Sequence, residues 1–378
     1  MPPNNMIHQG LYFAPKLINY RLFRTFGWPE ILPVSLTVSV TNLCNSRCRT
    51  CYLWQLHQDK PELKEKDFKT WEFEETFQNL NSKIFWVTMS GGEPFLRADL
   101  PQICESFNRY CSPKIINIPT NSLLPSTIES KTKEILEKCP GADLVINLSL
   151  DGVGEEHDRI RNVPGNFKLF LDTYERLSRL KSEFPNFQIG IHSVVSKFSI
   201  DGLMDVYELA EKMNADSYIT EVAEHRTELF NVDKDITPTA AEYKQFIRKL
   251  SESIKAESKS SKSVSKTTQA FRLVYYELVA RELAEHKQVI PCYAGYASAQ
   301  INAFGDVWPC CVLGYSKPMG NLRENNYNFR KIWFSKQATD VRMHIKARNC
   351  SCPLANAHYT NILLSFRQLI KVTRNMVA

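Results

Sequence analysis

The sequence of 378 residues lacks any run of 18 apolar residues, and its polar N-terminus lacks the apolar core of a secretory signal peptide. These absences argue against a membrane-spanning helix and against secretion, so we expect a cytoplasmic protein. Strong charge is missing as well: the net charge is only +6 and the basic residues are dispersed, which argues against nucleic-acid binding. Hydrophobic residues at 43% and charged residues at 23% are typical of a globular protein, and no internal repeat is evident.

Cysteine, by contrast, is plentiful. In a reducing compartment thiols stay free, so 11 cysteines favour metal binding over disulfides. Most of them fall in two groups, namely Cys44, Cys48 and Cys51, and then Cys292, Cys310, Cys311, Cys350 and Cys352. The isolated cysteines are expected to be buried small hydrophobic residues: Cys104, Cys111 and Cys139.

The first group has three cysteines and no fourth. Cys44, Cys48 and Cys51 have the spacing C-x3-C-x2-C and follow an apolar run. A structural zinc ion is usually closed by four protein ligands, whereas three thiolates can hold three irons of a cubane cluster and leave the fourth iron open. A zinc knuckle is the alternative, and it predicts a colourless protein instead of a brown one.

Strand-like and helix-like segments alternate between residues 33 and 235. We predict strands at 36–40, 84–88, 115–118, 144–150, 188–195 and 217–222, and helices at 71–79, 100–110, 127–137, 167–180 and 203–212. This alternation predicts parallel βαβ units. Polar motifs follow the first four strands, at 44–51, 90–94, 120–121 and 149–152. Because functional residues gather at the C-terminal ends of parallel strands, these motifs should meet on one rim.

The cysteine loop and the tetrapeptide Gly91-Gly92-Glu93-Pro94 resemble the two halves of the signature of the radical S-adenosylmethionine (SAM) superfamily. The resemblance implies an α/β fold, a partial (β/α)6 TIM-like barrel, and a [4Fe-4S] cluster held by the first three cysteines. Its open iron would bind SAM, and reductive cleavage would yield a 5′-deoxyadenosyl radical that abstracts hydrogen from the substrate. In one departure, Thr50 stands where the family often has an aromatic residue, so no side chain stacks on the adenine there.

The resemblance also implies which residues bind SAM. The expected contacts are Gly91, Gly92, Glu93, Asn121, Ser149 and Arg161. The glycines allow close approach, and a carboxylate or carbonyl at Glu93 can accept hydrogen bonds from the ammonium of SAM. Ser149 is expected to bind the ribose or the carboxylate of SAM, and Arg161 to pair with that carboxylate. Alternatively, Arg161 is a surface arginine and Asp151 a turn former before Gly152.

The second group resembles the SPASM/twitch type of cysteine-rich extension. Cys292-x12-Gly305-x4-Cys310 is its opening pattern, with a hairpin predicted over 299–307. The longer C-x2-C-x5-C-x3-C run of a full SPASM module is absent. We therefore expect one auxiliary [4Fe-4S] cluster, with a zinc site as the alternative. Its expected ligands are Cys292, Cys310, Cys350 and Cys352, with Cys311 a spare or alternative ligand.

Five parts are expected along the chain: an N-terminal amphipathic extension (1–32), the core barrel (33–235), a helical linker (236–290), the auxiliary domain, described as a small α+β hairpin domain (291–362), and a C-terminal helix (363–378). The N-terminal extension should pack on the barrel mouth, or else contact a partner or a membrane surface. The C-terminal helix is basic and amphipathic and should be docked on the protein, or else face a membrane. The linker contains a Ser/Lys-rich stretch at 251–268.

The sequence thus predicts a radical SAM oxidoreductase or modifying enzyme that oxidises or rearranges its substrate. Only 43 residues precede Cys44, too few for a leader-binding domain. This favours a small molecule, such as a sugar, nucleotide or lipid precursor, over a ribosomal peptide or protein side chain. An electron donor such as flavodoxin or ferredoxin is the expected partner. A non-catalytic, zinc-stapled interaction protein is the alternative of another class.

Candidate acid–base residues near the ends of strands five and six are His192, Glu221, Glu224 and His225. None shows a recognisable partner pattern, so no catalytic residue is assigned from the sequence.

Overall fold

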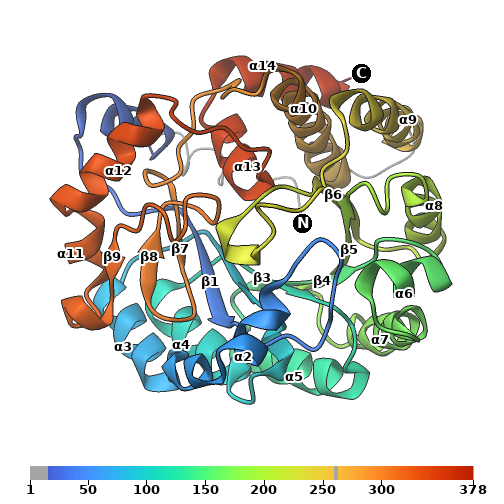
Figure 1. The fold of residues 1–378 in the computed structure, drawn as a ribbon, viewed down its shortest axis with the longest axis horizontal. Coiled ribbons are helices and arrows are strands. Elements are labelled where there is room, and N and C mark those ends of the chain that lie inside the picture. The colour runs from blue at the N-terminus through green and yellow to red at the C-terminus, as the bar shows by residue number, and fades with distance from the viewer. Residues whose placement is uncertain (1–15, 259–262, 378) are drawn as a thin grey trace.

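This computed structural model describes residues 16–258 and 263–377. A nine-stranded sheet forms its centre (Figure 1). The strand order is β6-β5-β4-β3-β2-β1-β7-β8-β9. Six parallel strands follow one another in chain order: β1 (Ser35–Thr41), β2 (Trp86–Gly91), β3 (Ile115–Thr120), β4 (Asp143–Ser149), β5 (Phe187–Val195) and β6 (Ser217–Val222). This arrangement confirms the predicted partial (β/α)6 barrel.

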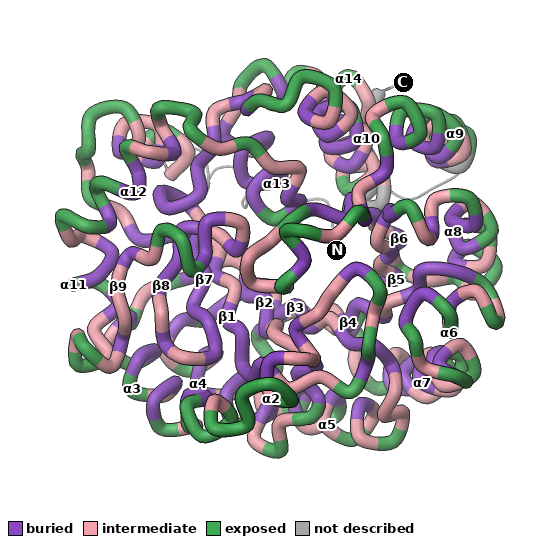
Figure 2. The backbone as a smooth tube through the Cα atoms, viewed as in Figure 1, coloured by how far each residue is buried: buried purple, intermediate pink, exposed green. Residues whose placement is uncertain are grey.

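Helices connect the parallel strands and cover the outside of the sheet (Figure 1). They are α3 (Thr70–Leu80), α4 (Leu100–Cys111), α5 (Pro125–Lys138), α6 (Glu155–Arg161), α7 (Asn166–Leu180) and α8 (Leu203–Lys212). Strand β1 alternates between two buried faces: Leu36, Val38 and Val40 are fully buried on one face, and the polar Ser39 and Thr41 are buried on the other. Figure 2 shows this burial along the strands and exposed residues on the outer sides of the helices.

The sheet continues from the barrel into the cysteine-rich extension. Strand β7 (Ser298–Ile301) pairs in parallel with β1, and β8 (Asp306–Trp308) and β9 (Gly320–Asn321) follow in antiparallel order. This confirms the predicted hairpin. Its turn requires glycine, since Gly305 has φ +88° and a Cβ atom there would lie 2.3 Å from the Phe68 ring.

Further helices complete the structure: α9 (Ala240–Ser258), α10 (Ser263–Glu285), α11 (Phe329–Trp333), α12 (Lys336–Lys346), α13 (Ala355–Leu363) and α14 (Phe366–Val377). The predicted single C-terminal helix over 363–378 is wrong at its start, because Leu363 ends α13 and α14 begins at Phe366. Residue 378 lies outside the described residues, as do 259–262 of the Ser/Lys-rich stretch. No helix in the described ranges is long and apolar enough to cross a membrane.

The N-terminal helix, residues 16–26, packs on the cysteine-rich C-terminal extension and not on the barrel mouth. Its Tyr20 and Phe23 are buried against Tyr293 and Tyr296, which lie just before β7. The Phe23 and Tyr296 rings meet edge to face, with centroids 5.6 Å apart. The predicted packing on the barrel mouth is therefore wrong, because these aromatic residues offer a closer apolar surface. Residues 1–15 of the predicted extension lie outside the described part of the chain.

A buried carboxylate joins the extension to the outer helix layer. Glu72 of α3 accepts hydrogen bonds from Arg323 Nε at 2.6 Å and Nη2 at 2.7 Å, and from the Tyr327 hydroxyl at 3.1 Å. Burial alone would raise the pKa of Glu72, but these hydrogen bonds and one from the Lys69 amide lower it. The fork-on-fork geometry fixes both position and orientation of the two segments.

Replacing Arg323 with methionine should lower the free energy of unfolding by about 2 kcal/mol, because it leaves the Glu72 carboxylate buried and short of donors. Thermal or denaturant unfolding measures this. The matched control is Lys133→Met, which removes an exposed ion pair with Glu183 at 2.9 Å and should change stability by less than about 0.5 kcal/mol. Equal effects of the two variants would contradict the assigned role.

Candidate active site

The first three cysteines lie on the loop that follows β1, at the C-terminal rim of the barrel. Two backbone hydrogen bonds tie this loop to the end of α6: Arg47 N to Arg161 O at 3.2 Å, and Arg49 N to Ile160 O at 3.0 Å. Within the loop, the Ser46 amide lies 3.5 Å from Cys44 Sγ and its hydroxyl 3.1 Å from Cys48 Sγ. The loop is thus held in place by groups outside the cysteines themselves.

The two glycines at the end of β2 fit against the backbone of this loop. A Cβ atom at Gly91 would lie 2.0 Å from Thr41 O, and one at Gly92 would lie 2.1 Å from Leu43 O. Such a contact is impossible, so only glycine can stand at either position. The close approach that the sequence indicated is therefore made to the chain's own backbone, and it positions the cysteine loop.

Glu93 is buried and its carboxylate is surrounded by protein donors. It accepts hydrogen bonds from the Phe95 amide at 3.1 Å, the Thr120 hydroxyl at 2.9 Å and the Asn121 amide at 2.7 Å. Burial raises the pKa of this carboxyl to about 7. The Asn121 side chain reaches the cysteine loop, with Nδ2 2.7 Å from Asn45 Oδ1 and 3.9 Å from Cys44 Sγ. Glu93 and Asn121 therefore join the ends of β2 and β3 to the first cysteine.

Arg161 is buried, and so the alternative of a surface arginine is wrong. Its Nε lies 2.8 Å from Asp151 Oδ2, and its Nη1 donates to Cys48 Sγ at 3.6 Å. Asp151 also accepts a hydrogen bond from the Val194 amide at 2.7 Å, so it is more than a turn former. Ser149, the last residue of β4, pairs with His192 of β5 in the sheet.

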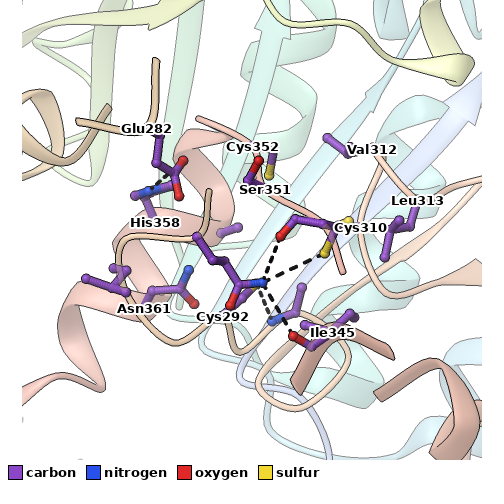
Figure 3. Close-up of a pocket in the computed structure, with 15 residues that line it drawn as sticks. Glu282, Cys292, Cys310, Val312, Leu313, Ile345, Ser351, Cys352, His358 and Asn361 are labelled. Atoms are coloured by element: carbon purple, nitrogen blue, oxygen red, sulfur yellow. Dashed lines mark hydrogen bonds and ion pairs between the residues drawn. The ribbon is translucent and has the colours of Figure 1, made fainter. Parts of the chain in front are cut away.

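The predicted ligands of the second group meet around one cavity (Figure 3). They come from separate segments: Cys292 precedes β7, Cys310 follows β8, and the other two, Cys350 and Cys352, lie between α12 and α13. Cys311 is not among the lining residues. It lies instead beside Arg226 and forms a hydrogen bond with the Glu228 side chain.

Burial governs the chemistry of both cysteine groups. It raises the pKa of Cys51 to about 12, of Cys292 to about 11 and of Cys310 to about 12, and it also raises the pKa values of Cys44, Cys350 and Cys352. Such thiols ionise readily only when a positive partner is supplied. Bound iron supplies that charge, so the donor sets fit iron–sulfur clusters.

Within residues 16–258 and 263–377, no three His, Cys, Asp or Glu side chains lie close enough together to hold one metal ion.

A segment after β6, residues 223–231, contacts both cysteine groups, and we call it the connecting segment. On one side, the Tyr52 amide donates to Leu229 O at 2.9 Å and Asn231 Nδ2 donates to Thr50 O at 2.9 Å. On the other side, Arg226 and Glu228 lie beside Cys311. The connecting segment therefore lies between the two predicted cluster sites.

Charged side chains of this region form a network. Arg226 pairs with Glu224 at 2.5 Å and approaches Glu221 at 3.9 Å, while His192 lies 3.6 Å from Glu221. Three of the four candidate acid–base residues are thus brought together, but His225 is exposed and bonds to Lys234 O at 2.8 Å. Arg226 and Glu228 were not predicted from the sequence. The signal was the density of charged residues at 221–228, at the end of a strand and just beyond it.

A parallel barrel with a three-cysteine loop on its C-terminal rim, extended by a domain with four converging cysteines, defines an iron–sulfur protein of the SAM-cleaving type. Residues 38–210 match the model of the radical SAM superfamily, and residues 292–353 match the SPASM iron-sulfur cluster-binding domain. The chain belongs to the radical SAM superfamily and carries a C-terminal SPASM domain. It is an enzyme whose cofactors are SAM, a [4Fe-4S] cluster and a further iron–sulfur cluster in the SPASM domain.

Several characterised proteins are similar to this chain. AdoMet-dependent heme synthase of Methanosarcina barkeri is 28% identical over 65% of this chain and 67% of its own length. The antilisterial bacteriocin subtilosin biosynthesis protein AlbA of Bacillus subtilis is 23% identical over 86% of this chain and 66% of its own length. Streptococcus suis SuiB, solved with its precursor peptide SuiA, shares the fold, with a TM-score of 0.57 at 15% identity over 90% of this chain and 72% of SuiB.

Replacing Gly92 with alanine should displace the cysteine loop, because the added Cβ would overlap Leu43 O. We expect the variant to lose roughly half of the protein-bound iron, since one of two four-iron clusters is disturbed. Iron analysis and visible absorbance under anaerobic conditions measure the loss. Gly141→Ala is the control, since a Cβ atom at Gly141 meets nothing within 4 Å. Full iron in the Gly92 variant would disprove the positioning role.

Proposed function

We propose that this enzyme abstracts a hydrogen atom from an unactivated C–H bond of a peptide and completes an oxidation with help of the auxiliary cluster. The observation that carries this proposal is the position of the connecting segment. It contacts the loop of Cys51 on one side and Cys311, which follows β8, on the other. A substrate held against this segment lies between the two cluster sites. Residues 33–235 then form the core barrel and 291–362 the auxiliary domain, joined by 236–290.

In this proposal the SAM-binding [4Fe-4S] cluster is held by Cys44, Cys48 and Cys51. When bound, the cluster and SAM would supply reductive cleavage of a carbon–sulfur bond and abstraction of a hydrogen atom from the substrate. The chain's own groups fix the geometry of this site. Gly91, Gly92 and Glu93 hold the cysteine loop against β2.

Two side chains donate toward the cysteine sulfur atoms and face the same rim. Arg161 donates to Cys48 Sγ, and Asn121 Nδ2 lies near Cys44 Sγ. These donors stabilise the negative charge of the thiolates, and we propose that the remaining N–H groups of Arg161 and the end of β4 at Ser149 contact SAM. Asp151 holds the Arg161 guanidinium in place from the opposite side.

We propose that the auxiliary cluster is a single [4Fe-4S] ligated by Cys292, Cys310, Cys350 and Cys352. Four cysteine ligands leave no open position, so this region suits electron transfer over direct binding of the substrate. Cys311 lies beside Arg226 and Glu228 of the connecting segment and is not a ligand in this proposal. A flavodoxin or ferredoxin is the proposed electron donor.

A peptide is proposed as substrate because the similarity to AlbA extends over 86% of this chain, and AlbA acts in bacteriocin biosynthesis. Bacteriocins are peptides. The second candidate is a small molecule of the porphyrin type, because AdoMet-dependent heme synthase is 28% identical. Both candidates are oxidised through the same arrangement of cluster sites.

Iron content tests the two ligand sets. The anaerobically purified enzyme should hold roughly eight irons, and a variant with alanine at Cys44, Cys48 and Cys51 should keep roughly four. A variant with alanine at Cys310 and Cys352 should also keep roughly four but should still bind SAM. Cys311→Ser is the matched control and should retain all iron. Loss of four irons from this control would contradict the assignment of Cys311.

Product analysis tests the reaction. With SAM and dithionite under anaerobic conditions, the enzyme should form 5′-deoxyadenosine, and a short peptide encoded beside its gene should lose about 2 Da for each oxidised position, since two hydrogen atoms are removed. Mass spectrometry measures both products. Consumption of a porphyrin with an unchanged peptide mass would select the second candidate, and absence of 5′-deoxyadenosine would refute the activity.

A further inference from the structure

The two helices nearest the ends of the chain carry basic residues and no acidic ones. Residues 16–26 read KLINYRLFRTF, and α14 reads FRQLIKVTRNMV. Each helix contributes three cations, namely Lys16, Arg21 and Arg24, and then Arg367, Lys371 and Arg374. Such a bias is unlike the chain as a whole, in which 47 basic residues are nearly balanced by 41 acidic ones.

These two helices lie next to each other although they are far apart in the sequence. Arg21 Nε donates to Leu364 O, just before α14, at 2.8 Å. The guanidinium of Arg21 also lies over the ring of Phe366, 3.6 Å from its centroid. The two ends of the chain therefore meet at Arg21, and α14 forms the upper edge of the molecule in Figure 1; of its cations, Lys371 pairs with Glu277 of α10.

Large apolar side chains on these two helices, and one just after the first helix, are exposed to solvent. We call them the terminal face: Ile18 (55% exposed), Phe26 (75%), Trp28 (70%), Phe366 (69%) and Ile370 (55%). Ile18 lies one helical turn before Arg21, and Ile370 one turn after Phe366, so each flanks the contact between the helices.

The fold does not require these residues to be exposed. The N-terminal helix already buries Tyr20 and Phe23, and α14 already buries Val372. Polar residues at the exposed positions of both helices would leave this packing intact. Clustered exposed apolar residues ringed by polar ones mark surfaces that contact another phase or molecule.

We propose that the terminal face binds the surface of an anionic lipid bilayer. Aromatic and aliphatic side chains would enter the interface between head groups and acyl chains, while the cations contact the anionic head groups. The bias toward positive charge favours this occupant over a second copy of the chain, because two copies would bring like charges together. An acidic protein would match the charge but offers no reason for five exposed apolar residues.

A hollow between the N-terminal helix and α12 extends the basic surface. It is lined by Arg24 and Lys346, by the buried Arg342, and by Phe26 and Met343, with Glu30 as its acidic residue. Arg24 Nε also donates to Cys292 O at 2.9 Å. The N-terminal helix that carries part of the terminal face thus adjoins the auxiliary cysteine group.

The test is sedimentation of the full-length, iron-loaded protein with vesicles of phosphatidylcholine containing 30% phosphatidylglycerol. We expect binding that weakens at least fivefold in vesicles of phosphatidylcholine alone or in high salt, because the charge attraction is lost. The variant Phe26→Ser with Phe366→Ser should also bind at least fivefold more weakly. Trp71→Ser is the control, since Trp71 is 57% exposed on α3, and it should bind as the wild type does.

Iron content and thermal unfolding of the Phe26/Phe366 variant should match the wild type, because both side chains are exposed. If that variant misfolds, Arg367→Gln with Arg374→Gln provides the second test and should likewise weaken binding. Binding unchanged in either folded variant would overturn the proposal. Failure of the wild-type protein to sediment with the anionic vesicles would also overturn it. A dimer, or a complex with an acidic carrier protein, would then be the occupant of the terminal face. None of these outcomes depends on SAM cleavage, which is measured separately.

Discussion

The close backbone contact between the end of β2 and the start of the cysteine loop is the constraint on which the site depends. Gly92 N donates to Thr41 O and Glu93 N donates to Leu43 O, each at 2.8 Å. No side chain can stand at Gly91 or Gly92, and the buried Glu93 carboxylate then joins this contact to β3 through Thr120 and the Asn121 amide. The loop that carries the first three cysteines is therefore shaped by its neighbours before any cofactor binds.

The continuous sheet imposes the second constraint. Strand β1 lies between β2 and β7, so the strand that leads into the first cysteine loop is hydrogen-bonded to the first strand of the SPASM domain. The side chain of Gln300 on β7 reaches Ser39 on β1 at 3.3 Å and Glu228 of the connecting segment at 3.0 Å. The relative position of the two cysteine groups is thereby set by backbone pairing and not by a flexible linker.

The sequence was sufficient for features that depend on local pattern. The limits of β6 and α8 were predicted to the residue, because apolar periodicity determined them. Features that depend on tertiary contacts were not accessible. The pairing of Arg161 with Asp151, the engagement of Glu93 by protein donors and the position of Cys311 beside Arg226 and Glu228 each require segments far apart in the sequence to be placed together. The break between α13 and α14 was missed because both helices are amphipathic and no proline or glycine separates them.

The two cysteine groups also differ in the donors that the chain aims at their sulfur atoms. The first group receives a charged donor, Arg161, at Cys48. The second receives neutral ones: Gln288 Nε2 lies 3.8 Å from Cys350 Sγ, and the Ala294 amide lies 3.5 Å from Cys292 Sγ. Hydrogen bonds to cysteine sulfur tune the reduction potential of a bound cluster, and buried donors act more strongly because little water competes. Because Arg161 ends α6 and Gln288 follows α10, segments outside both cysteine loops supply these donors to each site.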